Sequence, residues 1–296
     1  MNPYTFLQRK LFFLIPLLGL LAYSQVTAQV SVHLQMNKKN YVIGEPITAT
    51  LNITNRSGRQ LVLSSNQVSA WLNFQVSIAG RNIPPARKIN YKPAVIPAGQ
   101  SIARSVNIST AYAIGRVGNY TCSSSVRLPG STITGTTSNR VHFTVAKGRT
   151  VWRQRAGLPK DPNQVREYGL ITFNGNGGLE LFAEVKSKNT GLGIATIPLG
   201  KVISFRNPTA SIDRKSHMHA LYQVKPDLFT HVEISPNGRI LSSSHHKRGK
   251  LGAPRLTTFT SGEVVVAGSV PFDPKKAAAD RRKIHPISER PPILFK

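Results

Sequence analysis

Three histidines in the second half of the sequence have the spacing of a candidate metal site. His217 and His219 are two residues apart in a stretch with strand-like alternation, and His231 follows a short turn. Side chains at i and i+2 of a strand point to one face, and sequential antiparallel strands usually pair, so we expect the three imidazoles to face one another. Three nitrogen ligands with an open fourth position hold zinc and activate water, which makes a His-based metal-dependent hydrolase one hypothesis.

The other interpretation is that these histidines are structural or exposed. No H-E-x-x-H spacing accompanies them, and bare spacing matches often arise by chance. Asp213 lies close by in the sequence, whereas His245 and His246 open a basic segment, H-H-K-R-G-K (245–250), which we predict to be a solvated turn. Our main expectation is that the protein has no cofactor, with zinc as the alternative.

Other catalytic chemistry has little support in the sequence. The single cysteine, Cys122, excludes an intramolecular disulfide and Cys-rich metal sites, and in a predicted buried strand it is not a nucleophile. No G-x-S-x-G motif occurs, and N-G-N-G-G (174–178) is a predicted hairpin turn. Glu45 is the one carboxylate between residues 29 and 148, so a glycosidase pair cannot form there, and we expect it to pair with a surface Lys or Arg. We assign no catalytic and no cofactor-binding residue, and expect a protein that is not an enzyme.

The elements that must position these residues are predicted to be β-strands. Between residues 30 and 145, runs such as P-I-T-A-T-L-N-I-T (46–54) and W-L-N-F-Q-V-S-I (71–78) alternate with period two and are separated by Gly, Pro and Asn. This pattern indicates six or seven antiparallel strands, the usual content of a β-sandwich.

Two segments of this first part resemble bacterial immunoglobulin-like modules. Y-V-I-G-E-P-I-T-A-T-L-N-I-T-N-R-S-G (41–58) is similar to their two opening strands, and V-G-N-Y-T-C (117–122) is similar to the late strand in which a tyrosine corner forms. The resemblance implies that the Tyr120 hydroxyl bonds to backbone upstream and that Cys122 and Trp71 fill the core. The chain departs from antibody domains because it lacks a second cysteine for an inter-sheet bridge.

The second part is also predicted to be antiparallel β-structure, after a basic, Pro-containing connection at about 147–163. Segments 170–185, 210–224 and 255–270 each contain a strand, a polar turn and a strand ending in Val, and they recur about every forty residues, near the length of a propeller blade. The stretch from Asp213 through Leu221 resembles a strand that recurs in blade-like repeats of uncharacterised exported bacterial proteins. Three units do not close a ring, so we expect a blade-like β-meander.

These patterns divide the chain into four predicted regions. Residues 1–28 have a basic start, an apolar run too short to span a bilayer and small residues before Gln29, which is the layout of a cleaved signal peptide. An immunoglobulin-like sandwich follows at 29–148, a blade-like domain at 149–270 and a basic, Pro-containing, extended or mobile tail at 271–296. The predicted fold class is therefore all-β, and the predicted location is periplasmic or extracellular, with no transmembrane segment after cleavage.

The strongest compositional signal is charge. The chain has 39 Lys and Arg against 12 Asp and Glu, a formal net charge of +27. Such a field attracts anionic polymers, although a general composition bias of exported proteins is the simpler explanation, and the scattered basic residues do not favour specific nucleic-acid binding. We therefore expect a non-catalytic exported binding or interaction module, whose partner is an anionic envelope polysaccharide or another protein. The alternatives are the metal-dependent hydrolase and a protease inhibitor.

Overall fold

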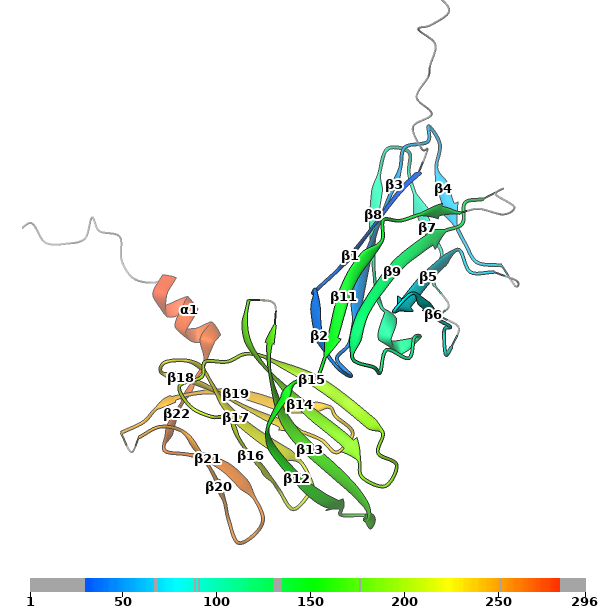
Figure 1. Ribbon diagram of the computed structural model, residues 1–296. Coiled ribbons are helices and arrows are strands. Elements are labelled where there is room, and N and C mark those ends of the chain that lie inside the picture. The colour runs from blue at the N-terminus through cyan, green and yellow to red at the C-terminus, as the bar shows by residue number, and fades with distance from the viewer. Residues whose placement is uncertain are drawn as a thin grey trace, which may run out of the picture.

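The chain folds almost entirely into β-strands. A computed structural model describes residues 30–282, except 67–68, 88, 90, 130–134, 176 and 251, and the predicted signal peptide at 1–28 lies outside the described residues. In Figure 1 the strands form two bodies, a blue-to-green one from the first part of the chain and a green-to-orange one from the second. The all-β prediction is confirmed.

Two sheets of the first part pack face to face. The smaller sheet has the order β1-β3-β8 and contains β1 (Val30–Met36), β3 (Thr48–Asn55) and β8 (Ser101–Asn107). The larger has the order β2-β11-β9-β5-β6, with β10 beside β9, and contains β2 (Asn40–Val42), β5 (Leu72–Ile78), β6 (Arg81–Ile83), β9 (Gly118–Val126), β10 (Thr136–Thr137) and β11 (Val141–Ala146). A separate ribbon pairs β4 (Leu61–Leu63) with β7 (Ala94–Ile96), and a 3-10 turn follows β8 at Ile108–Thr110.

The core of the first part has the residues that the sequence predicted. Trp71 and Cys122 are buried, and the Tyr120 hydroxyl donates a hydrogen bond to the Arg116 carbonyl at 2.6 Å, which confirms the predicted upstream backbone bond. One pairing differs from the antiparallel prediction: β2 runs parallel to β11, because the chain leaves the first sheet after β1 and enters the second. The immunoglobulin-like assignment itself stays a prediction.

The second part also contains two packed sheets. The first has the order β12-β13-β14-β15 and contains β12 (Arg149–Leu158), β13 (Asp161–Gly175), β14 (Gly178–Ser187) and β15 (Gly193–Lys201). The second has the order β16-β17-β18-β19-β22 and contains β16 (Thr209–Ile212), β17 (Met218–Lys225), β18 (Leu228–Ile234), β19 (Ile240–Arg248) and β22 (Ser269–Phe272). A two-stranded ribbon contains β20 (Arg255–Thr258) and β21 (Val264–Ala267).

Each of the three predicted hairpins forms, and each belongs to a different sheet. Antiparallel partners close the β13–β14, β16–β17 and β20–β21 turns. The predicted connection at 147–163 is wrong, because β12 and the start of β13 occupy most of it. Basic, solvent-facing side chains gave this stretch the composition of a linker, although its backbone pairs along its length.

Alternation along β17 decides which residues form the core and which form the candidate site. Met218, Ala220 and Tyr222 face the β12-β15 sheet and are buried with Leu170 and Leu181. The intervening residues of β17 therefore lie on the outer face of the second sheet. Two of the three predicted metal ligands lie on this outer face: His219 on β17 and His231 on β18.

The predicted boundary of the tail at residue 271 is wrong. Phe272 pairs with His245 at the edge of the second sheet, and helix α1 spans Pro274–Arg282. Asp273 caps this helix, since its Oδ1 accepts a hydrogen bond from the Lys275 N–H at 2.8 Å. Asp followed by Pro at the first helical position is a helix-start signal that the composition of the segment obscured. No helix in the described part of the chain is long and apolar enough to span a membrane.

The two parts of the chain meet at a small junction. The ammonium of Lys38 lies 2.7 Å from Glu45 Oε1 and 2.8 Å from Glu180 Oε2, and it also lies 5.4 Å from the centre of the Phe182 ring. Val42 packs there with Phe182 in an apolar cluster that joins β2 to the β12-β15 sheet. Glu45 thus pairs with a lysine as expected, but at 3% exposure it is buried at this junction instead of lying on the surface.

Candidate functional site

The turn between β16 and β17 fixes the first carboxylate of the site. The Asp213 N–H donates to the His217 carbonyl at 3.0 Å, and Asp213 Oδ1 accepts from the N–H groups of Lys215 at 2.9 Å and His217 at 2.7 Å. Aspartate commonly stabilises tight turns by bonding to backbone two residues on. Because the turn occupies Oδ1, the second oxygen, Oδ2, is left to face the histidines.

Ser216 holds this turn against the opposite sheet. Its φ of 62° lies in the left-handed region, which is uncommon for a residue other than glycine. Its Oγ donates to the Gly157 carbonyl at 2.6 Å, and its own carbonyl accepts from the Tyr168 hydroxyl at 2.5 Å. Gly157 and Tyr168 belong to β12 and β13, so two hydrogen bonds to the other sheet hold Ser216 in this conformation.

Strand register then brings histidine and glutamate together. His219 of β17 stands opposite Glu233 of β18. His217 Nδ1 lies 2.8 Å from Glu233 Oε1 and 3.7 Å from Asp213 Oδ2, and His219 Nε2 lies 3.5 Å from the same Asp213 oxygen. One ligand atom from each of Asp213, His219 and Glu233 lies within 4.8 Å of the other two. We call Asp213, His217, His219, His231 and Glu233 the His–carboxylate cluster.

A chain of hydrogen bonds runs from the cluster across the sheet. His219 Nδ1 lies 3.1 Å from His231 Nε2, and the two rings stack with centres 5.3 Å apart. Ser244 Oγ of β19 lies 3.5 Å from His231 Nδ1 and 2.9 Å from His246 Nε2, and His246 Nδ1 lies 3.0 Å from Ser269 Oγ of β22. Every strand from β17 to β22 in this sheet therefore contributes a polar group to one connected row.

Burial and neighbouring charge shift the protonation of this row. Burial, with smaller contributions from His219 and His246, lowers the pKa of His231 to about 4, so this imidazole is neutral at neutral pH. Burial alone would raise the pKa of Glu233, but hydrogen bonds from His217 and Ser242 hold it below its usual value. Burial also lowers the pKa of His246. Glu233 is thus ionised and His231 is neutral at neutral pH, and an ionised carboxylate and a neutral imidazole are the forms of these side chains that bind metal ions.

The structure places the three predicted ligands in one cluster but in different roles. His219 and His231 touch each other through ring nitrogens, whereas His217 is hydrogen-bonded to Glu233. The group with mutually close ligand atoms contains His219 together with Asp213 and Glu233. Pairing of the H-V-E segment at 231–233 with β17 is the signal that would have identified Glu233, because directly opposed residues share a face. The set of three histidines stays a prediction.

The prediction of a solvated turn at 245–250 is wrong for its first residues. His245 and His246 lie in β19, paired with β18 on one side and with β22 on the other. His245 Nδ1 is 3.1 Å from Thr230 Oγ1, while His246 faces the cluster row. The basic residues that follow suggested a loop, but adjacent strands impose the extended backbone.

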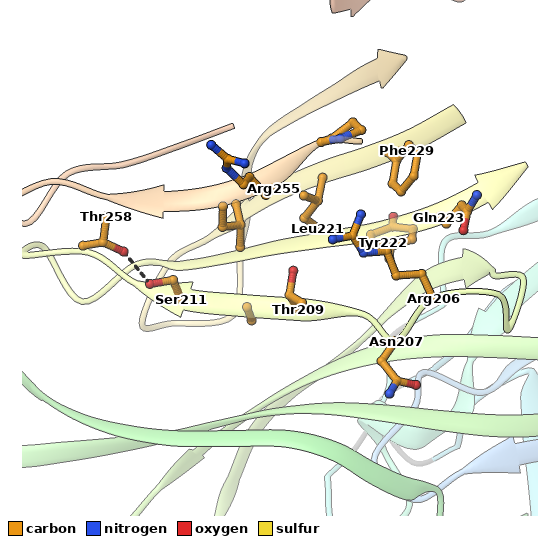
Figure 2. A pocket seen from close by; sticks show the side chains of 13 residues that line it. Arg206, Asn207, Thr209, Ser211, Leu221, Tyr222, Gln223, Phe229, Arg255 and Thr258 are labelled. Carbon is orange, nitrogen blue, oxygen red and sulfur yellow. Dashed lines mark hydrogen bonds between the residues drawn. The ribbon is translucent and has the colours of Figure 1, made fainter. Parts of the chain in front are cut away.

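A pocket opens on the same outer face, beside the cluster. It has a volume of about 280 Å³ and lies between β16, β17 and β20 (Figure 2). Ser211, which lines it, stands opposite His219 in the register, and its hydroxyl lies 3.0 Å from that of Thr258 on β20. The pocket and the cluster are therefore neighbours on one sheet.

The pocket combines an apolar floor with two arginines. Leu221, Phe229 and Pro254 are buried in its wall. Figure 2 shows Arg206, from the segment before β16, and Arg255, from β20, on either side of Leu221. Neither arginine has an ion-pair or hydrogen-bond partner among the described residues, and no carboxylate lines the pocket.

The single thiol is remote from both features. Cys122 is buried in the first part, and burial raises its pKa to about 12. A thiol with this pKa is protonated at neutral pH.

Comparison with known proteins adds little to this description. No protein-family model matches the chain, and no curated protein matches it. Among solved structures the chain is similar to Spo0M, a sporulation control protein from Bacillus subtilis, with 14% sequence identity and a TM-score of 0.26. The match covers 61% of this chain and 86% of Spo0M. A score this low supports no inference about fold or function.

Proposed function

We propose that the protein is a non-catalytic, exported binding protein that holds an anionic unit of an envelope polymer in the pocket between β16, β17 and β20. The observation that carries the proposal is the pair of unpartnered guanidinium groups, Arg206 and Arg255, beside a buried apolar floor. A planar guanidinium binds carboxylate, sulfate or phosphate through paired hydrogen bonds.

The lining favours an acidic sugar over a bare anion. The buried side chains of Leu221 and Phe229 offer a surface to the C–H groups of a sugar ring, and Thr209 and Asn207 offer hydroxyl and amide groups at the rim. Ligand sites usually combine such an apolar surface with a few placed polar groups. The excess of basic over acidic residues in the chain attracts the same class of polymer at longer range.

Chromatography on immobilised heparin, with a chelator present, tests the proposal against the simple effect of net charge. The double variant Arg206→Ala/Arg255→Ala is compared with Arg56→Ala/Arg81→Ala, which removes the same charge from two exposed positions of the first part. We expect the pocket variant to elute at lower salt than the control and to reduce the slope of log affinity against log salt by about 1 to 2.

The competing explanation is a compositional charge with no shaped site. It predicts equal shifts in elution for the two double variants, and that result would refute the proposal. A competition arm with monomeric galacturonate separates a pocket that binds one acidic sugar from a surface that binds only extended chains. The proposal requires free galacturonate to displace the wild-type protein from immobilised heparin and to leave the elution of the pocket variant unchanged.

A further inference from the structure

Independently of the anionic-ligand proposal, we infer that Asp213, His219 and Glu233 form a binding site for a divalent transition-metal ion such as Zn²⁺. The three residues come from the β16–β17 turn, β17 and β18, and their ligand atoms lie within 4.8 Å of one another. This set differs from the three histidines that the sequence suggested, since it contains one imidazole and two carboxylates.

The distances between the three ligand atoms allow all of them to bind one ion after small movements of the side chains. For three atoms no more than 4.8 Å apart, some point lies within about 2.8 Å of all of them. Zinc–nitrogen and zinc–oxygen bonds are about 2.0 to 2.2 Å long, so each ligand atom needs to move inward by less than about 1 Å. Side-chain rotation supplies such a movement without a change in strand register.

In each proposed ligand, a second polar atom of the side chain makes a hydrogen bond that orients the ligand atom. Asp213 Oδ1 accepts two backbone N–H groups of its own turn, which leaves Oδ2. Glu233 Oε2 accepts from the Ser242 hydroxyl at 3.1 Å, so the ion would bind Oε1 and replace its present contact with His217 Nδ1. His219 Nδ1 is hydrogen-bonded to His231 Nε2, which leaves Nε2. Metal ligands in proteins are typically oriented by outer hydrogen bonds of this kind.

The charge arrangement also favours an exchangeable cation. The side chains of Asp213 and Glu233 are 11% and 25% exposed, and their ion-pair partners among the described residues are histidines only. The chain has 39 Lys and Arg residues, yet among the described residues none of them forms an ion pair with Asp213 or Glu233. An imidazole nitrogen is a common metal ligand, so a metal ion bound at this position would neutralise the two carboxylates and keep His219 as its partner.

His217 and His231 complete the environment of the ion. His217 Nδ1 lies 2.8 Å from Glu233 Oε1 and 3.7 Å from Asp213 Oδ2, so it is a neighbour of both carboxylates. His231 acts behind His219 as a positioning residue. Mixed imidazole and carboxylate ligands suit zinc, cobalt, nickel and manganese, and do not favour copper(I), which prefers sulfur.

The test is metal titration of the purified, untagged full chain after chelator treatment. Zn²⁺ competition against a chromophoric chelator gives stoichiometry and affinity, and Co²⁺ gives visible absorption bands that report coordination number. We expect one equivalent to bind, and we expect His219→Ala and Glu233→Gln each to weaken binding at least about tenfold. The matched control is His33→Ala/His142→Ala, which removes two exposed histidines of the first part and should leave the affinity unchanged.

Two outcomes would overturn the inference. One is the absence of saturable zinc binding to a wild-type chain that is folded by circular dichroism. The other is binding that survives in His219→Ala and Glu233→Gln but falls in the control, which would assign the zinc to adventitious surface histidines. Should His219→Ala fail to fold, Asp213→Asn and Glu233→Gln, which preserve shape, still decide the result.

Discussion

The junction at Lys38 and the His–carboxylate cluster each hold two acidic side chains close together, but with different basic side chains beside them. At the junction, Glu45 and Glu180 share the ammonium of Lys38, within 2.8 Å of each carboxylate. In the cluster, Asp213 and Glu233 face imidazoles instead. A buried carboxylate requires a partner in either case, because an isolated charge in a poorly solvated site is costly.

The difference separates a structural contact from an exchangeable one. Burial alone would lower the pKa of Lys38, but hydrogen bonds to Glu180 and Glu45 raise it above its ordinary value of 10.5, so the lysine stays charged and cannot ligate a metal. Histidine nitrogens are available when neutral. The junction is thus suited to fastening the first part to β14, and the cluster is suited to accepting a different cation.

The largest expected effect is at the junction. Lys38→Met removes the ammonium that Glu45 and Glu180 share, and breaking a buried ion pair in this way typically costs about 3 to 5 kcal/mol. We expect the free energy of unfolding in urea to fall by about 3 kcal/mol. Lys188→Met, at an exposed position whose ammonium has no partner among the described residues, should change it by less than about 0.5 kcal/mol.

The pH dependence of this effect has a definite sign. The folded-state pKa of Lys38 is raised, so its contribution is complete below about pH 10.5 and declines as the pH rises through the raised value. The difference in the free energy of unfolding between wild type and Lys38→Met should therefore have its full value at pH 7 to 9 and become smaller above pH 10.5. A difference that grows with alkaline pH would contradict the assignment of Lys38 as the shared cation.

An intermediate effect is expected at the two tyrosines that anchor turns. Tyr168→Phe removes the bond to the Ser216 carbonyl, and Tyr120→Phe removes the bond to the Arg116 carbonyl. Each should lower the free energy of unfolding by about 1 to 1.5 kcal/mol, the usual cost of a lost internal hydrogen bond. Only Tyr168→Phe should also weaken zinc binding, because Ser216 holds the turn that carries Asp213. Equal zinc affinity in both variants would show that the anchor does not shape the site.

Local pattern predicted much of the fold. The Asn and Gly residues between β13 and β14 mark a hairpin, and alternation in β3 gives the buried Ala49, Leu51 and Ile53. Tyr120 and Cys122 lie as the immunoglobulin-like resemblance implied. These successes share a cause: alternation and turn chemistry act over a few residues, which a sequence displays directly.

What the sequence did not show depends on long-range pairing. The contact of Lys38 with Glu180 joins residues 142 positions apart, and no local pattern specifies it. Strand register places Glu233 opposite His219, and the pairing of β19 with β18 brings His246 into the same row. Side chains in such a row share a face only once the order of strands is known, so the histidines were found and their carboxylate partner was not.

The smallest expected effect sharpens the contrast between the two regions. Glu233→Gln, in metal-free protein, removes one charge from a side chain that is 25% exposed, and its amide can still accept the hydrogen bond from Ser242. His217 keeps its contact with Asp213 and its access to water, so the free energy of unfolding should change by less than about 1 kcal/mol. Glu45→Gln, at 3% exposure and beside a charged lysine, should cost about twice as much or more. If urea unfolding instead ranks Glu233→Gln as the more damaging of the two, the cluster is a structural ion-pair network like the junction. The histidines would then serve as fixed cations, not as ligands awaiting a metal.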